Sequence, residues 1–265
     1  MAARAIWKGS IELGRIQLPI KLYSAVEDRS IHFHLLEKRT HARVKQHMVN
    51  PATSKEVPNG EIRKGYEVER DIFVVVDDDD LQQVVAEPST KIEVTTFLPQ
   101  GRIGEPYYDR PYYLGPDGDQ KTYFAFAEAL ANKEREGLAR WVMRKKEYIG
   151  ALRSRDGYLL LITLRHAEEV LTAREIGAPP GKAPDLREIK MAEQLVSALE
   201  GEFRAEDYSD NYRSRVLKHI EAKAKGRKPK LEAMPKRGRE PKSLVDALAA
   251  SLKSARVKAK EKAVA

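Results

Sequence analysis

The amino-acid sequence predicts a mainly β fold with some α-helix, followed by a helical segment and a basic tail. Three observations predict it. Up to about residue 175, apolar residues occur in short, often alternating runs that turn residues separate. Two amphipathic helical patterns follow, and the end of the chain holds the excess positive charge. Many short strands with few helices favour a barrel or sandwich with insertions over a doubly wound sheet.

The predicted strands come first. Residues 6–26 alternate, with Gly9 and Gly14 expected at bulges or turns and Pro19 at an edge or bulge. The segment IHFHLLE also alternates, and a polar, basic stretch with the turns NPATSK and VPNG follows it. The runs IFVVV, TKIEVTTFL and GYLLLITLR have the composition of strands. LQQVVAE, residues 81–87, predicts a short helix, and KTYFAFAEALANKEREGLARWVMR predicts a helix that leads into a strand.

Two helices and a tail are predicted after the strands. Residues 185–225 carry two apolar stripes, which can pack on the body or form a dimer contact. Residues 226–265 are rich in Lys and Pro and are expected to be flexible, except for a short amphipathic helix that begins near Ser243. An apolar stripe along this helix is expected to dock on another surface, because so short a helix is marginal alone. The stripe comprises Leu244, Val245, Leu248 and Leu252.

Charge is unevenly distributed along the chain. There are 48 Lys and Arg residues against 40 Asp and Glu residues, a formal net charge of +8. Residues 221–265 hold 14 basic and 5 acidic residues, a net of +9, so the preceding 220 residues carry −1. A near-neutral body with a basic tail indicates a polyanionic partner, most often nucleic acid, although a solubilising tail gives the same pattern.

Composition also excludes several classes of protein. The absence of cysteine excludes disulfides and thiolate metal sites. No apolar run approaches the roughly 18 residues of a membrane span, and no secretory signal is visible, so we expect a cytoplasmic protein without a membrane partner. The P-loop, G-x-G-x-x-G and G-x-S-x-G motifs are absent. Four histidines fit none of the usual closed zinc motifs and are interpreted as ordinary: His32, His34, His41 and His47.

Four consecutive carboxylates follow IFVVV: Asp77, Asp78, Asp79 and Asp80. One interpretation is the metal corner of a nuclease or nucleotidyl enzyme. The favoured interpretation is a helix start with Asp79 or Asp80 as N-cap, because consecutive side chains point in different directions and carboxylates complement the positive end of a helix dipole.

Six motifs stand in order along nearly the whole chain. The first two are AIWKGSIELGRIQLPIKLYSA and IRKGYEVERDIFVVVDDDDL. YYDRPYYLGPD and EYIGALRSRDGYLLLITLR follow, then FRAEDYSDNYRSRVLKHIEAKAKG and SLVDALAASLKS. In this order they resemble the bacterial Ku proteins, which bind DNA ends in non-homologous end joining. One departure is that VKQHMVNP contains no cysteine, where many relatives have a cysteine-containing segment, and this makes a zinc role less expected.

The resemblance implies a β-barrel core with a strand-rich arm in residues 1–184, a helical segment for dimer or core packing in 185–225 and a Lys-rich flexible tail in 226–265. It implies a homodimeric, nucleoid-associated ring that threads onto double-stranded DNA ends and recruits an ATP-dependent DNA ligase. It implies no catalysis, cofactor or metal. The alternatives are the metal-dependent enzyme at residues 77–80 and an architectural nucleoid protein that binds duplex anywhere.

Site residues follow from the resemblance and from the basic loops. No base-reading helix is evident, so DNA contacts would be made to the phosphate backbone. The apolar stripe of the tail is the candidate ligase contact. The candidate DNA-binding residues are Lys38, Arg39, Arg43, Lys45, Arg63, Lys64, Arg144, Lys145, Lys228, Lys230, Lys236 and Arg237.

Overall fold

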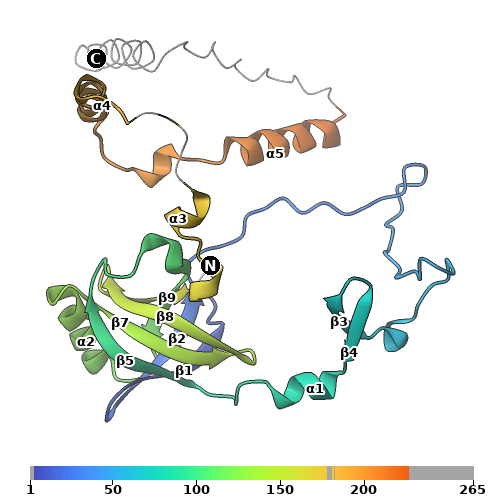
Figure 1. Ribbon diagram of the computed structural model, residues 1–265, viewed down its shortest axis with the longest axis horizontal. Helices are drawn as coiled ribbons and strands as arrows, with labels where there is room; N and C mark the ends of the chain where they lie inside the picture. The colour runs from blue at the N-terminus through green and yellow to red at the C-terminus, as the bar shows by residue number, and fades with distance from the viewer. Residues whose placement is uncertain (1–2, 178–180, 182, 227–265) are drawn as a thin grey trace. The chain divides into compact units, whose positions relative to one another are not determined.

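Seven strands within the part of the chain that the structure describes form a closed barrel (Figure 1). The computed structural model describes residues 3–177, 181 and 183–226. The chain divides into two compact units, Met1–Ile176 and Gly177–Ala265. Within the described part of the first unit, seven strands close in the order β1, β2, β6, β9, β8, β7, β5. The predicted mainly β class with a barrel core and an inserted arm is confirmed.

The barrel strands are short and almost all antiparallel. The exception is the parallel pair of β1 with β5, which closes the barrel and sets Ser10 opposite Lys91. The predicted strands at residues 6–26, TKIEVTTFL and GYLLLITLR correspond to β1 with β2, β5 and β9. The bounds are β1 Trp7–Leu13, β2 Ile16–Ser24, β5 Lys91–Pro99, β6 Tyr108–Pro116, β7 Arg135–Met143, β8 Lys146–Arg155 and β9 Tyr158–Leu164.

Close backbone packing supports the closing pair of strands. The Lys91 Nζ atom lies 2.8 Å from the Glu12 Oε1 atom across it. A Cβ atom on Gly9 would lie 2.1 Å from the Thr90 carbonyl oxygen, so only glycine fits there. Gly9 lies in regular pairing with Ile20, which corrects the expected bulge or turn. Gly14 occupies the β1–β2 turn with a φ of +61°.

Helix α2, Gln120–Asn132, completes the hydrophobic core beside β7, β8 and β9. Asp119 caps it and accepts a hydrogen bond of 3.1 Å from the Thr122 N–H. Its Tyr123 side chain is fully buried, and the Tyr123 hydroxyl donates to the Leu114 carbonyl and accepts from the Leu159 N–H at 2.9 Å. Burial raises the pKa of Tyr123 to about 12. Tyr123 therefore links the helix to strands β6 and β9.

A partly buried polar pair fixes the start of β6. The Tyr108 hydroxyl donates a hydrogen bond of 2.8 Å to Glu136 Oε2, and Glu136 is fully buried on β7. Burial, followed by this bond to Glu136, raises the pKa of Tyr108 to about 12. The Arg153 guanidinium lies 4.7 Å from the centre of the Tyr108 ring. The connection from β5 to β6 is thereby attached to the sheet.

The arm is the insertion between β2 and β5. It contains the two-stranded ribbon of β3, Lys64–Glu69, and β4, Ile72–Val76, and the helix α1, Asp78–Gln83. The prediction of a strand in IFVVV is confirmed as β4. The alternating segment IHFHLLE forms no strand, since its only ladder contact in the described chain is an isolated bridge between Leu36 and Arg43.

The second unit contains two helices among its described residues, α4, Leu186–Ala198, and α5, Asn211–Ala224. Both helices were predicted. Asp185 caps α4 by accepting a hydrogen bond of 2.8 Å from the Glu188 N–H, and Asp210 caps α5 by accepting one of 2.9 Å from the Arg213 N–H. Neither helix has a buried residue. No helix within the described ranges is both long enough and apolar enough to cross a membrane.

Replacing Tyr123 by Phe tests the link between α2 and the barrel. The change leaves the buried Leu159 N–H and Leu114 carbonyl without their partner, so we expect the free energy of unfolding to fall by about 1–3 kcal/mol. Urea denaturation measures it. Tyr158→Phe is the matched control, because this hydroxyl makes no hydrogen bond within the described residues and its side chain is 47% exposed. Equal losses in the two variants would contradict the assignment.

Candidate nucleic-acid interface

The first of two short hairpins in the arm carries the first group of candidate cations. The Leu36–Arg43 bridge closes a turn with Lys38 and Arg39 at its tip, and both side chains are exposed. Within the described chain neither makes an ion pair, so both are free to meet phosphate. Arg43 is engaged, since its Nη2 atom lies 2.6 Å from Nδ1 of His34. Lys45 follows this hairpin and is exposed.

The second hairpin explains one of the predicted turn segments. The Val49–Glu56 bridge closes it, and the Asn50 side chain accepts a hydrogen bond of 2.9 Å from the Ala52 N–H inside the predicted NPATSK turn. His47 Nδ1 pairs with Glu56 Oε1 beside the bridge. These hydrogen bonds hold the turn.

The next candidate cations, Arg63 and Lys64, face the aspartates. The Arg63 Nε atom lies 3.7 Å from Asp77 Oδ1, and Lys64 Nζ lies 2.8 Å from Asp78 Oδ1. The hydrogen bond from Lys64 lowers the pKa of Asp78 below its ordinary value. The positive charges of Arg63 and Lys64 are therefore partly neutralised by these two aspartates.

The aspartates begin a helix. The Asp77 N–H donates a hydrogen bond of 2.9 Å to Asp80 Oδ2, and α1 starts at Asp78. The N-cap is Asp77, which corrects the expected Asp79 or Asp80. The helix begins three residues earlier than the predicted Leu81, because the carboxylates of its first turn stabilise a helix start. It ends at Gln83. Throughout the described part of the chain, no three His, Asp or Glu side chains converge as a metal site.

Arg144 and Lys145 form the turn between β7 and β8. Met143 pairs with Lys146, so the loop has two residues, and their φ values are +51° and +66°. This left-handed conformation is that of a type I′ turn, which favours Asn-Gly or Asp-Gly. A non-glycine residue pays about 1 kcal/mol or more for it. Both side chains are exposed and neither makes an ion pair within the described residues.

The adjacent β8–β9 turn gives an internal comparison. Arg155 pairs with Tyr158, and the two loop residues are Asp156 and Gly157 with φ values of +52° and +79°. This turn has the residue types that its backbone prefers, whereas the β7–β8 turn has two cations instead. Backbone strain of this kind is typical of functional positions. The sequence pattern had marked Arg144 and Lys145 only as basic, and strand pairing was needed to reveal the strain.

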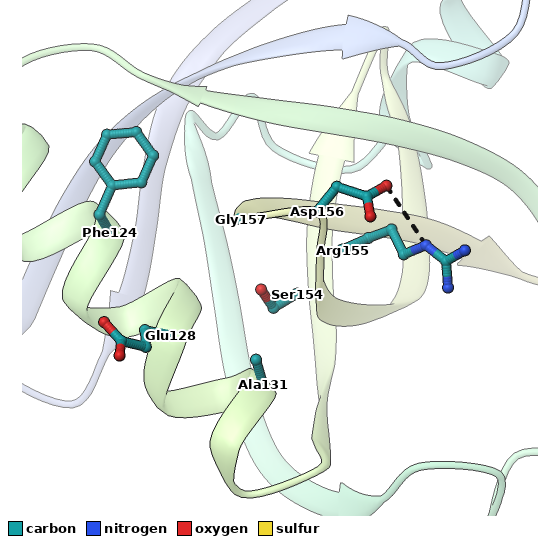
Figure 2. Close-up of a pocket in the computed structure, with 7 residues that line it drawn as sticks. All are labelled: Phe124, Glu128, Ala131, Ser154, Arg155, Asp156 and Gly157. Atoms are coloured by element: carbon teal, nitrogen blue, oxygen red, sulfur yellow. Dashed lines mark ion pairs between the residues drawn. The ribbon is translucent and has the colours of Figure 1, made fainter.

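A surface hollow of about 440 Å³ lies between α2 and the β8–β9 turn (Figure 2). Phe124 and Glu128 of α2 line one side of it and Ser154 of β8 lines the other, while Arg155 Nε lies 3.6 Å from Asp156 Oδ2 at its edge. Within the described chain Ser154 makes no hydrogen bond with Glu128 or Asp156, so it lacks the partner that would activate it. Two carboxylates against one guanidinium make the hollow unfavourable for phosphate.

The remaining candidates lie outside the described residues. They are the tail cations Lys228, Lys230, Lys236 and Arg237 and the tail stripe Leu244, Val245, Leu248 and Leu252. One cation that the prediction left out of the DNA-binding group is Lys146, beside the β7–β8 turn. Its Nζ atom lies 5.5 Å from the centre of the Tyr148 ring. Three consecutive cations, Arg144, Lys145 and Lys146, thus stand at this end of the barrel.

Comparison with known proteins identifies the family. The family described as the Ku70/Ku80 beta-barrel domain matches residues 12–194. The non-homologous end joining protein Ku of Coxiella burnetii is 36% identical over 230 residues, 85% of this chain and 84% of that protein. The protein of the same name from Archaeoglobus fulgidus is 34% identical over 254 residues, 95% and 99% of the two chains. The protein of the same name from Anaeromyxobacter sp. (strain K) is 36% identical over 256 residues, which cover 96% of this chain and 86% of that protein. The chain belongs to the Ku family.

Proposed function

We propose that the protein binds double-stranded DNA ends without sequence preference, as a homodimeric ring that acts in non-homologous end joining at the nucleoid. The match to the Ku family over most of the chain carries this proposal. The protein is proposed to act without catalysis, cofactor or metal of its own. The tail stripe is proposed to recruit an ATP-dependent DNA ligase.

Exposed apolar residues of the arm support the homodimer. Phe33 is 68% exposed, Tyr66 69% and Phe73 57%, although all three are large and apolar. An isolated two-stranded ribbon such as β3–β4 is marginal in water. Tyr66 pairs with Val74 and Phe73 with Glu67, so the two rings lie on opposite faces of the ribbon. Large apolar side chains left exposed on both faces are typical of a surface that another chain covers. We therefore assign the arm as the surface that a second copy covers.

Unpaired cations support binding to the phosphate backbone. Lys38 and Arg39 at a hairpin tip and Arg144 and Lys145 at the strained turn have no carboxylate partner within the described residues. Arg63 and Lys64 do have such partners, so we rank them lower as DNA contacts. The tail adds 12 basic against 4 acidic residues after Gly226, which favours attachment to any duplex by counterion release.

Two alternatives receive less support. The metal-dependent enzyme needs free carboxylates at residues 77–80, but Asp77, Asp78 and Asp80 already contact Arg63, Lys64 and the backbone of the α1 start. An architectural protein that binds duplex anywhere needs only the cations. The ring is distinguished from it by a requirement for a free end.

Linear and covalently closed circular duplexes of equal length test the ring. Because a closed ring threads only over an end, we expect the linear fragment to be bound and the circle to be left free in a gel-shift competition. Cutting the circle once should restore binding. Equal affinity for both would favour the architectural protein, and cleavage of either with Mg²⁺ or Mn²⁺ would favour the metal-dependent enzyme.

The double variant Arg144→Asn with Lys145→Gly tests the strained turn. It supplies the residues that a type I′ turn prefers, so we expect the free energy of unfolding to rise by about 1 kcal/mol. Because the homodimer carries two copies of the turn, loss of up to four phosphate contacts should weaken binding to DNA ends and lower the slope of log affinity against log salt by up to about 4. Thermal unfolding and salt titrations measure both effects.

The matched control for the turn is Lys121→Gln with Lys133→Gln. It removes the same charge from exposed cations of α2 and its C-cap, which have no assigned role. It should leave both the stability and the salt slope near those of the parent protein. If this control lowers the slope as much as the turn variant does, net charge and not the turn decides binding.

Phe73→Asp tests the arm as the dimer interface. A charge in an apolar interface without a partner is strongly unfavourable, so we expect the dimer to dissociate at concentrations where the parent protein remains a dimer. Sedimentation equilibrium measures it. Ile16→Asp is the control, since Ile16 is 54% exposed at the β1–β2 turn and outside the arm. Dissociation of both variants to the same extent would reject the arm as the specific interface.

A further inference from the structure

An uncovered apolar face runs along α4 in the second unit. Leu186 is 77% exposed, Val196 66% and Leu199 64%, and Ile189 lies on the same helix at 39%. Beside them is a hollow of about 470 Å³ whose lining includes Ile189, Ala192 and Val196. Nothing among the described residues buries this face.

Helix α4 has too little support of its own. It has 13 residues and a well-formed N-terminal cap at Asp185, but none of its residues is buried. Helices of this length are marginal in water, and most of their stability comes from packing of the apolar face. A further segment is therefore needed to cover it.

We propose that the chain's own residues 243–252 dock on the apolar face of α4. The sequence of this segment places Leu244, Leu248 and Leu252 at i, i+4 and i+8, one stripe of an amphipathic helix. Such a stripe spans about 12 Å, and α4 spans about 20 Å, so the stripe fits along one face of the helix.

Charge favours this occupant over an arbitrary apolar segment. Glu188 and Glu193 line the hollow on α4, and Glu193 makes no ion pair within the described chain. Lys242, Lys253 and Arg256 flank the leucine stripe in the sequence. Carboxylates beside an apolar groove and cations beside an apolar stripe form a complementary pair.

The covalent connection favours the chain's own segment over a separate one. Residues 227–242 form a connection of 16 residues after Gly226. A flexible chain of that length has an end-to-end distance of about 22 Å. A linker whose length matches the span it must bridge gives an effective concentration in the millimolar range. A second copy or another protein at micromolar concentration must compete with this. The contact would thus hold the stripe until a partner that binds it more tightly displaces it.

A cysteine pair in the full chain tests the contact. The protein has no cysteine, so Ser197→Cys at the hollow and Ser251→Cys beside the stripe introduce one defined pair. Under mild oxidation at micromolar protein, we expect an intramolecular disulfide to form at least about tenfold faster than in the control pair Ser214→Cys with Ser251→Cys, since only the first pair is held together. Ser214 is exposed on α5. Mass spectrometry and a non-reducing gel follow the reaction.

A second variant tests the contact without any further change to α4. Leu248→Asp changes only the tail and should reduce the rate for the Ser197 pair to that of the control pair. Equal rates for the two pairs without this change would overturn the proposal, as would disulfide-linked dimers as the main product, which would assign the face to a second copy. No DNA or ligase is present, so loss of end binding and loss of this contact are separate outcomes.

Discussion

Closure of the barrel by the parallel pair of β1 and β5 is the constraint on which the rest of the first unit depends. The chain leaves the barrel after Ser24, which pairs with Tyr112, and returns at Lys91, which pairs with Ser10. Both ends of the arm are therefore fixed by barrel hydrogen bonds, while its interior is almost wholly exposed. Because Gly9 admits the Thr90 carbonyl and Glu12 pairs with Lys91, the same strand that begins the fold also fixes the return of the arm.

The local surroundings of each cation decide its capacity for phosphate, and sequence position alone does not reveal them. Lys64 and Lys145 are both exposed lysines beside another cation. Lys64 lies 2.8 Å from Asp78, so binding phosphate would require it to leave a carboxylate. Lys145 has no such competitor within the described residues and stands on a backbone that costs stability. Asp77 and Asp78 thus compete with phosphate for the two cations nearest to them, and this strengthens the case for the β7–β8 turn.

Much of the fold could be predicted from the sequence, because period and composition are local properties. Alternation located β1 and β2, strand composition located β5 and β9, and the apolar stripes located α4 and α5. Alternation failed in IHFHLLE, where the pattern is present but the described chain supplies no strand to pair with it. The closing pair, the partly buried Tyr108–Glu136 contact and the left-handed Arg144 and Lys145 depend on residues distant in sequence, which no local pattern specifies. The candidate cations follow from the resemblance and from positive charge in predicted loops, and neither specifies which carboxylate a cation will meet.

The barrel and the other parts of the chain differ in what their apolar residues require. Tyr123, Leu114 and Leu159 are fully buried within the barrel, which satisfies its own core. Phe73 in the arm and Val196 on α4 are 57% and 66% exposed, so each lies on a surface that another segment can cover. A protein that binds DNA ends benefits from having both a buried core and exposed apolar surfaces. A self-sufficient barrel holds its shape before any partner arrives, while the surfaces that we propose a second copy and the tail to cover can respond to what binds them.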